Sequence, residues 1–71
     1  MYRHYYVNNN QTSNPGLHHE VHTEEHKNQL GIRSATYLGY FANETDAVAK
    51  AKAFYADADG CLICCPNAHR G

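Results

Sequence analysis

Residues 2–7 and 17–23 alternate between side chains of different character, which is typical of half-buried β-strands. The first segment is rich in tyrosine, a residue that favours strands. Between them, residues 8–16 (NNNQTSNPG) are polar and contain the turn-forming pair Pro15-Gly16. The pattern therefore predicts a β-hairpin with a long loop, and a loop of that length leaves the register open.

Residues 34–41 (SATYLGYF) predict a third strand, because they are rich in aromatic and β-branched residues. Strict alternation along this strand would place Leu38 and Tyr40 on the same face. Residues 24–33 before it are polar and irregular. They are typical of a connecting loop, or of a short helical turn through residues 24–30.

Residues 43–59 carry the signals of an α-helix. Asn43 is a good N-cap, and Asp46 stands at the third helical position, where it forms a variant of the capping box. Apolar residues then recur at helical spacing and form one stripe: Ala47, Val48, Ala51, Phe54, Tyr55 and Ala58. Gly60 is placed to end the helix in a left-handed conformation.

These elements predict a single small α+β domain over residues 1–71. We expect a three-stranded antiparallel sheet, with one helix (about residues 43–59) packed on one face and a short Cys-rich C-terminal tail. In that tail, Leu62 and Ile63 are expected to cover the sheet or to add a short strand.

The composition predicts a thin core. Val, Ile, Leu and Phe together number 11 of 71 residues, about 15%, whereas ordinary globular chains exceed about 20%. Disorder would bring high net charge and few aromatic residues, and neither holds here. A chain of this size with so few large aliphatic residues often needs a disulfide, a metal ion or a partner subunit to stay folded.

Charge and hydropathy exclude several classes of protein. The formal net charge is -1, from 6 basic and 7 acidic residues, so we do not expect a nucleic-acid partner. No apolar run approaches the roughly 20 residues that a membrane span needs. The first residues, MYRHYYV, lack the apolar centre of a signal peptide, and we expect a cytoplasmic protein.

Two short motifs predict a metal site. Cys61-x2-Cys64 has the spacing at which a tight turn presents two thiolates to one ion, and His22-x3-His26 matches the second half of a Cys2His2 set. The histidine pair precedes the cysteine pair, the reverse of the usual zinc-finger order. Zn²⁺ is the expected ion. The reserve donors are Cys65, which can replace either neighbouring cysteine, and His69.

Other roles for the cysteines remain open. Reduced thiols can simply pack as small apolar side chains. A thiol redox role is a second alternative, although this Cys-x2-Cys follows a predicted helix and no βαβ unit accompanies it. Hydrolysis by a Cys–His pair would need an enclosed substrate pocket, which 71 residues scarcely provide, so we do not expect an enzyme.

The tyrosines also have two interpretations. On an uncovered sheet face they would form an amphipathic platform for a protein partner or for stacked bases. Otherwise they replace the missing aliphatic residues in the core, which the shortage of accompanying Arg and Lys favours. The residues concerned are Tyr2, Tyr5, Tyr6, Tyr37 and Tyr40.

Four segments resemble those of a family of short, uncharacterised bacterial proteins. They are YYVN at residues 5–8, HEVH at residues 19–22, YLGYF at residues 37–41 and the cysteine-rich tail at residues 60–69. The family pattern is YYVN, HEVH, YLGxF and GCxxCCxxCH. This resemblance covers nearly the whole chain and implies a shared small α+β fold and a metal site, without an assigned activity.

Two positions depart from the family pattern. His26 stands where the family has a cysteine, and this exchange preserves a zinc donor. Ala68 stands where the family has another cysteine, and alanine provides no donor. We therefore expect a small binding or accessory module of unassigned process with a structural zinc site. The alternatives are a metal-free protein-interaction domain that uses a tyrosine-bearing sheet face, and a thiol redox protein.

Overall fold

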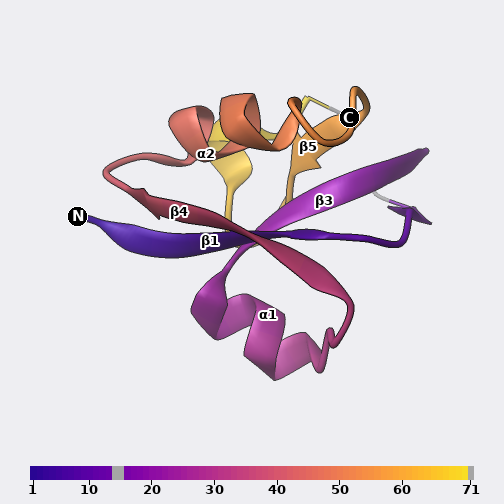
Figure 1. Cartoon of the computed structure of the whole chain (residues 1–71), viewed down its shortest axis with the longest axis horizontal. Helices are drawn as coiled ribbons and strands as arrows, with labels where there is room; N and C mark the ends of the chain where they lie inside the picture. The colour runs from indigo at the N-terminus through magenta and orange to yellow at the C-terminus, as the bar shows by residue number, and fades with distance from the viewer. Residues whose placement is uncertain (14–15, 71) are drawn as a thin grey trace.

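A mixed five-stranded sheet lies between two helices in the computed structural model of the chain, which describes residues 1–13 and 16–70 (Figure 1). The α+β class predicted from the sequence is confirmed. The elements in order are β1 (Arg3–Asn8), β2 (Thr12–Ser13), β3 (Leu17–Thr23), α1 (Glu24–Leu30), β4 (Ala35–Phe41), α2 (Glu44–Ala51), β5 (Ala58–Gly60) and the 3₁₀ turn η1 (Pro66–Ala68). Of the predicted Pro15-Gly16 turn, Pro15 lies outside the described residues.

The strands β1, β3 and β4 correspond to the three that were predicted, and the hairpin of β1 and β3 is antiparallel. The prediction of only three strands was wrong. Part of the long loop after β1 forms β2, which pairs antiparallel with β3, and the chain after α2 adds β5 parallel to β3. Val21 pairs with Val7 of β1 and with Gly60 of β5, so β3 has a neighbour on each edge.

The prediction of one long helix over residues 43–59 was also wrong. Asn43 is the N-cap and its side chain accepts a hydrogen bond from the Asp46 amide at 2.9 Å, as expected. The helix α2 nevertheless ends at Ala51, and the amides of Ala53 and Phe54 bond three residues back, Phe54 N to Ala51 O at 2.9 Å. The chain then turns into β5, because residues 58–60 pair with the free edge of β3.

A second helix, α1, covers part of the sheet face opposite α2 (Figure 1). It was predicted only as the alternative to a loop. Thr23 caps its first turn by accepting a hydrogen bond from the His26 amide at 3.3 Å. Gly31 ends the helix in the left-handed conformation, with φ of 69°. Neither α1 nor α2 has the length and apolar character of a bilayer span, in a search limited to the described residues.

A β-bulge in β4 changes which side chains share a face. Tyr5 pairs with Gly39 and Tyr6 with Tyr37, so Leu38 is the extra residue. Leu38 is buried in the core while Tyr40 is exposed, and the expectation that they lie on the same face was wrong.

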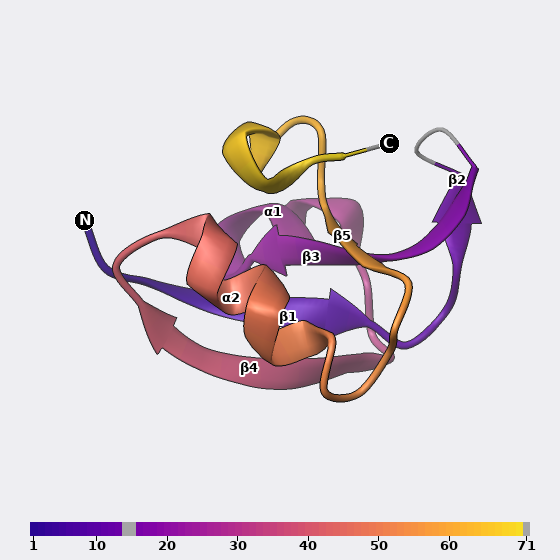
Figure 2. The ribbon, with the colours of Figure 1, turned by 90° about the horizontal axis from the view of Figure 1, so that it is seen from above.

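Between α2 and the sheet lies a core of small side chains, as the composition predicted. Apart from Tyr5, its largest aliphatic members are Val7, Val21, Val48 and Leu38, and four of the others are alanines. Figure 2 shows α2 lying across β1 and β4, with β5 beside β3.

The tail after β5 does not cover the sheet as expected. Leu62 and Ile63 are 55% and 76% exposed, and they form the turn of the Cys-x2-Cys segment. Gly60 belongs to β5 and does not end a helix.

Candidate metal centre

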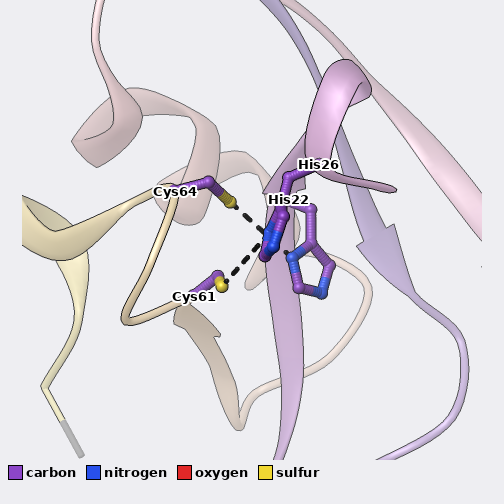
Figure 3. A group of neighbouring side chains, drawn as sticks. All are labelled: His22, His26, Cys61 and Cys64. Atoms are coloured by element: carbon purple, nitrogen blue, oxygen red, sulfur yellow. Dashed lines mark hydrogen bonds between the residues drawn. The ribbon is translucent and has the colours of Figure 1, made fainter. Parts of the chain in front are cut away.

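Four side chains from two segments far apart in the sequence meet beside the end of β3 (Figure 3). His22 lies in β3 and His26 in the first turn of α1, whereas Cys61 and Cys64 follow β5. Their donor atoms all lie within 4.8 Å of one another. These are the four residues that the two motifs predicted, and the fold brings them close enough to hold a metal ion.

The strand-to-helix junction positions the two histidines. His22 is the last but one residue of β3, and its side chain lies on the same sheet face as α1 because it pairs with Tyr6. The next residue, Thr23, caps α1 through the His26 amide. The four-residue spacing thus spans the end of a strand and the first turn of a helix, and both imidazoles face the cysteines (Figure 3).

The parallel strand β5 positions the two cysteines. The Cys61 amide donates to the Val21 carbonyl at 3.0 Å, which continues the pairing of β5 with β3. The Cys65 amide then donates to the Cys61 carbonyl at 2.8 Å and closes a tight turn. Gly60 makes this turn possible, because a Cβ there would lie 2.7 Å from the Cys65 carbonyl oxygen.

Two nitrogen–sulfur distances in the cluster match tetrahedral zinc coordination. Cys61 Sγ lies 3.6 Å from His26 Nδ1, and Cys64 Sγ lies 3.7 Å from His22 Nδ1. Bonds of about 2.3 Å to sulfur and 2.05 Å to nitrogen at tetrahedral angles separate these two donor types by about 3.6 Å. The remaining donor separations all lie within 4.8 Å, and two sulfur donors on one zinc ion lie about 3.8 Å apart.

The pKa values of the three thiols in and beside the cluster are shifted in different directions. A hydrogen bond from Cys65 lowers the pKa of Cys64 to about 3, and further hydrogen bonds from His22 and His26 act in the same direction. Burial raises the pKa of Cys61, and the hydrogen bond with Cys64 raises the pKa of Cys65. Metal ions bind the thiolate form, so Cys64 offers a ligand that is already deprotonated near neutral pH.

The two reserve donors lie outside the cluster. Cys65 is completely buried in the core, with its Sγ 3.8 Å from that of Cys64. His69 Nδ1 bonds to the Gly60 carbonyl at 3.1 Å and lies 3.3 Å from the carboxylate of Asp59. Both side chains therefore support the segment that carries the cysteines, and neither joins the four donors.

Glu20 lies on the same strand face as His22 and was not among the site residues predicted from the sequence. Its carboxylate accepts a hydrogen bond from the Thr12 hydroxyl, and it lines a cavity beside the candidate metal centre. The alternation along residues 17–23 places Glu20 and His22 on one face of the strand. This alternation was the sequence signal that could have placed Glu20 beside the metal centre.

Comparisons of the chain with protein-family models, curated proteins and solved structures find no significant match. The resemblance to short bacterial proteins therefore stays a prediction. The functional assignment rests on the geometry of the described residues.

Proposed function

We propose that this chain is a small binding or accessory module whose fold is held together by a structural zinc ion. The convergence of His22, His26, Cys61 and Cys64 is the observation that carries the proposal. Two neutral imidazoles and two thiolates are a complete ligand set for structural zinc. With four protein donors the ion keeps no open position, so the proposal includes no catalysis.

The thin core gives the ion a physical role. The turn at residues 61–65 exposes its two large aliphatic side chains and contributes mainly Cys61 and Cys65 to the interior. A metal ion would tie this turn to β3 and α1, and the free energy of metal binding would become free energy of folding. Thiolate ligands also require reducing conditions, so the proposal places the protein in the cytoplasm.

Metal analysis and thermal unfolding test the proposal together. Protein purified without chelator should contain about one zinc per chain. Free zinc at 100 times its dissociation constant should add about 2.7 kcal/mol to the free energy of unfolding. For a domain of this size that corresponds to a rise in Tm of about 10–20 °C.

Two variants and one control locate the ion. Substituting either His22→Ala or Cys64→Ser should abolish the zinc-dependent rise in Tm. His4→Ala removes an exposed imidazole from β1 and should leave the rise unchanged. Substitution of Zn²⁺ by Co²⁺ should give thiolate-to-metal absorption that disappears in Cys64→Ser. Metal content far below one per chain, with no stabilisation by zinc, would rule out the proposal.

A contiguous row of aromatic rings favours a second candidate, a docking face for a protein partner. On the sheet face beside α1, four ring pairs follow one another at centroid distances of 5.2, 4.6, 5.8 and 5.2 Å. In order, the rings are those of Tyr2, Tyr40, His4, Tyr37 and Tyr6. Of the five tyrosines considered in the sequence, only Tyr5 belongs to the core.

The bulge at Leu38 creates this row, because it brings Tyr37 and Tyr40 onto the same face. Exposed tyrosine rings offer a large contact area at a small cost in side-chain entropy, which suits protein recognition. If this is the function, Tyr40→Ala should weaken binding of a partner without changing zinc content. Phe54→Ala, an equally exposed ring site outside the row, is the control.

A further inference from the structure

The strand β4 forms one border of the sheet, and β1 is the strand that pairs with it among the described residues. At the other side of the sheet, β3 is covered along its outer edge by β2 and β5. Figure 2 shows β4 along the side of the sheet away from β5. A border strand presents a row of main-chain N–H and C=O groups with which a further strand can pair.

The strand β4 lacks most of the features that keep border strands from pairing with another chain. Such strands are usually very short or carry lysine or proline. The strands β2 and β5 are two and three residues long, whereas β4 has seven residues (ATYLGYF) with no charge and no proline. The bulge at Leu38 is the one protective feature in β4, and it weakens pairing without preventing it.

The side of α2 turned toward this border carries one acidic and one basic residue. Thr45, Ala49 and Lys52 line a cavity next to β5, so their side of the helix faces β5. At about 100° per residue, Asp46 and Lys50 fall on the other side of α2, toward β4. Both residues are exposed, and they lie one helical turn apart.

We propose that two copies of this chain form a dimer by antiparallel pairing of their β4 strands about a two-fold axis. The axis reverses α2 as well, so Asp46 of one copy faces the partner's Lys50, and this contact occurs twice. Paired strands lie about 4.8 Å apart, and α2 lies above β1 and β4, so the two helices would be about 10 Å apart, at packing distance. A second copy has the matching charges by symmetry, which a strand from another protein would have to supply separately.

The opposite face of β4 also suits a second copy. Tyr37 and Tyr40 are 50% and 57% exposed there, and they are the members of the aromatic row that belong to the border strand. Antiparallel pairing would bring the rings of the two copies beside each other, and aromatic pairs across neighbouring strands are stabilising. The dimer does not depend on the proposed zinc ion, because β4 contains none of the four donors.

Sedimentation equilibrium of the protein as purified, at about 5–500 µM, tests the proposal. One strand and one short helix form a small interface, so we expect a dissociation constant of about 10–100 µM. Amide hydrogen exchange should slow as the protein concentration rises, with the effect concentrated in residues 35–41. A chain that stays monomeric at the highest concentration would overturn the proposal, including the case in which another protein pairs with this border. So would a dimer in which exchange at residues 35–41 does not change.

Charge reversal tests the arrangement of the two helices. Asp46→Lys and Lys50→Asp should each weaken the dimer about tenfold, because the two-fold axis repeats every repulsive contact. The double variant exchanges the charges and should recover most of the affinity. Lys52→Asp, on the side of α2 that faces β5, is the control and should leave the dimer unchanged.

Two results with these variants would refute the pairing of the helices. One is an equal effect of Lys50→Asp and Lys52→Asp, which would indicate a general effect of net charge. The other is a double variant that dimerises no better than the single variants. Zinc content and Tm, measured on the same samples, show separately whether the metal centre and the fold are intact.

Discussion

Gly60 offers a direct test of how the metal-binding turn is built. The residue lies in β5 at ordinary negative φ, since the positive-φ glycines of the described chain are Gly16, Gly31 and Gly39. Backbone propensity alone predicts that Gly60→Ala stabilises the protein by about 0.5–1 kcal/mol, because alanine loses less conformational entropy on folding. Steric contacts predict instead that Gly60→Ala destabilises the protein.

The contacts at Gly60 are with backbone atoms that cannot simply rotate away. An added Cβ would lie 2.7 Å from the Cys65 carbonyl oxygen and 2.9 Å from the carbonyl carbon of Ala68. Overpacking of this kind costs about 1–3 kcal/mol. After the gain in propensity, we expect Gly60→Ala to lower the free energy of unfolding by about 1–2 kcal/mol. A 71-residue domain has only about 4–10 kcal/mol of stability in total, so the loss is readily measured.

Urea unfolding of the wild type, Gly60→Ala and Gly31→Ala measures this effect. Gly31 is the control because its φ is 69° while nothing lies within 4 Å of an added Cβ, so its cost of about 1 kcal/mol is purely conformational. Only Gly60→Ala should also weaken zinc binding, since the turn at residues 61–65 must move. If Gly60→Ala is as stable as the wild type and binds zinc equally well, the steric explanation of this turn is wrong.

Three further predictions use other parts of the structure. Cys65→Ala should keep one zinc per chain, because Cys65 is not a ligand. It should lose about 1–2 kcal/mol of stability, because it removes a buried sulfur, and loss of the metal on elemental analysis would contradict this prediction. Hydrogen bonds from Gln11 and His19 lower the pKa of Asp57 below its ordinary 3.8, so the carboxylate stabilises the fold above that pH. The advantage of the wild type over Asp57→Asn in urea unfolding should therefore be present at pH 6 and disappear as the pH falls below about 3.8, and a difference that persists at pH 2 would refute it. Val21→Ala should cost about 2 kcal/mol in the same assay, whereas Leu17→Ala, at an exposed site, should stay within about 0.5 kcal/mol.

Elements governed by neighbouring residues were the ones that could be predicted from the sequence. The alternation along residues 17–23 predicted β3, and the pair Asn43 and Asp46 predicted the start of α2, which the capping hydrogen bond confirms. Each of these depends on interactions within a few residues, where propensity and capping dominate.

The end of α2 could not be predicted in the same way. Residues 52–58 contain three alanines and suit a helix, but tertiary contacts end the helix before them. The Tyr55 ring stacks on His19 at a centroid distance of 3.8 Å, and Asp57 bonds to the same imidazole at 2.5 Å. Both contacts join this segment to β3, and neither is visible in a local pattern.

The four residues of the site were predicted from the spacing of two local motifs, but the spacing could not explain how the two halves meet. Spacing identified the pairs His22 with His26 and Cys61 with Cys64, but only the parallel register of β5 with β3 joins them. Val21 pairs with Gly60, so the next residue of each strand brings Cys61 beside His22. A slip of one residue would turn the alternate side chains to the other face and separate the donors. The histidines precede the cysteines in the sequence, the reverse of the usual zinc-finger order. The pairing of β5 with β3 at the edge of the sheet is enough to bring the two pairs together in that order.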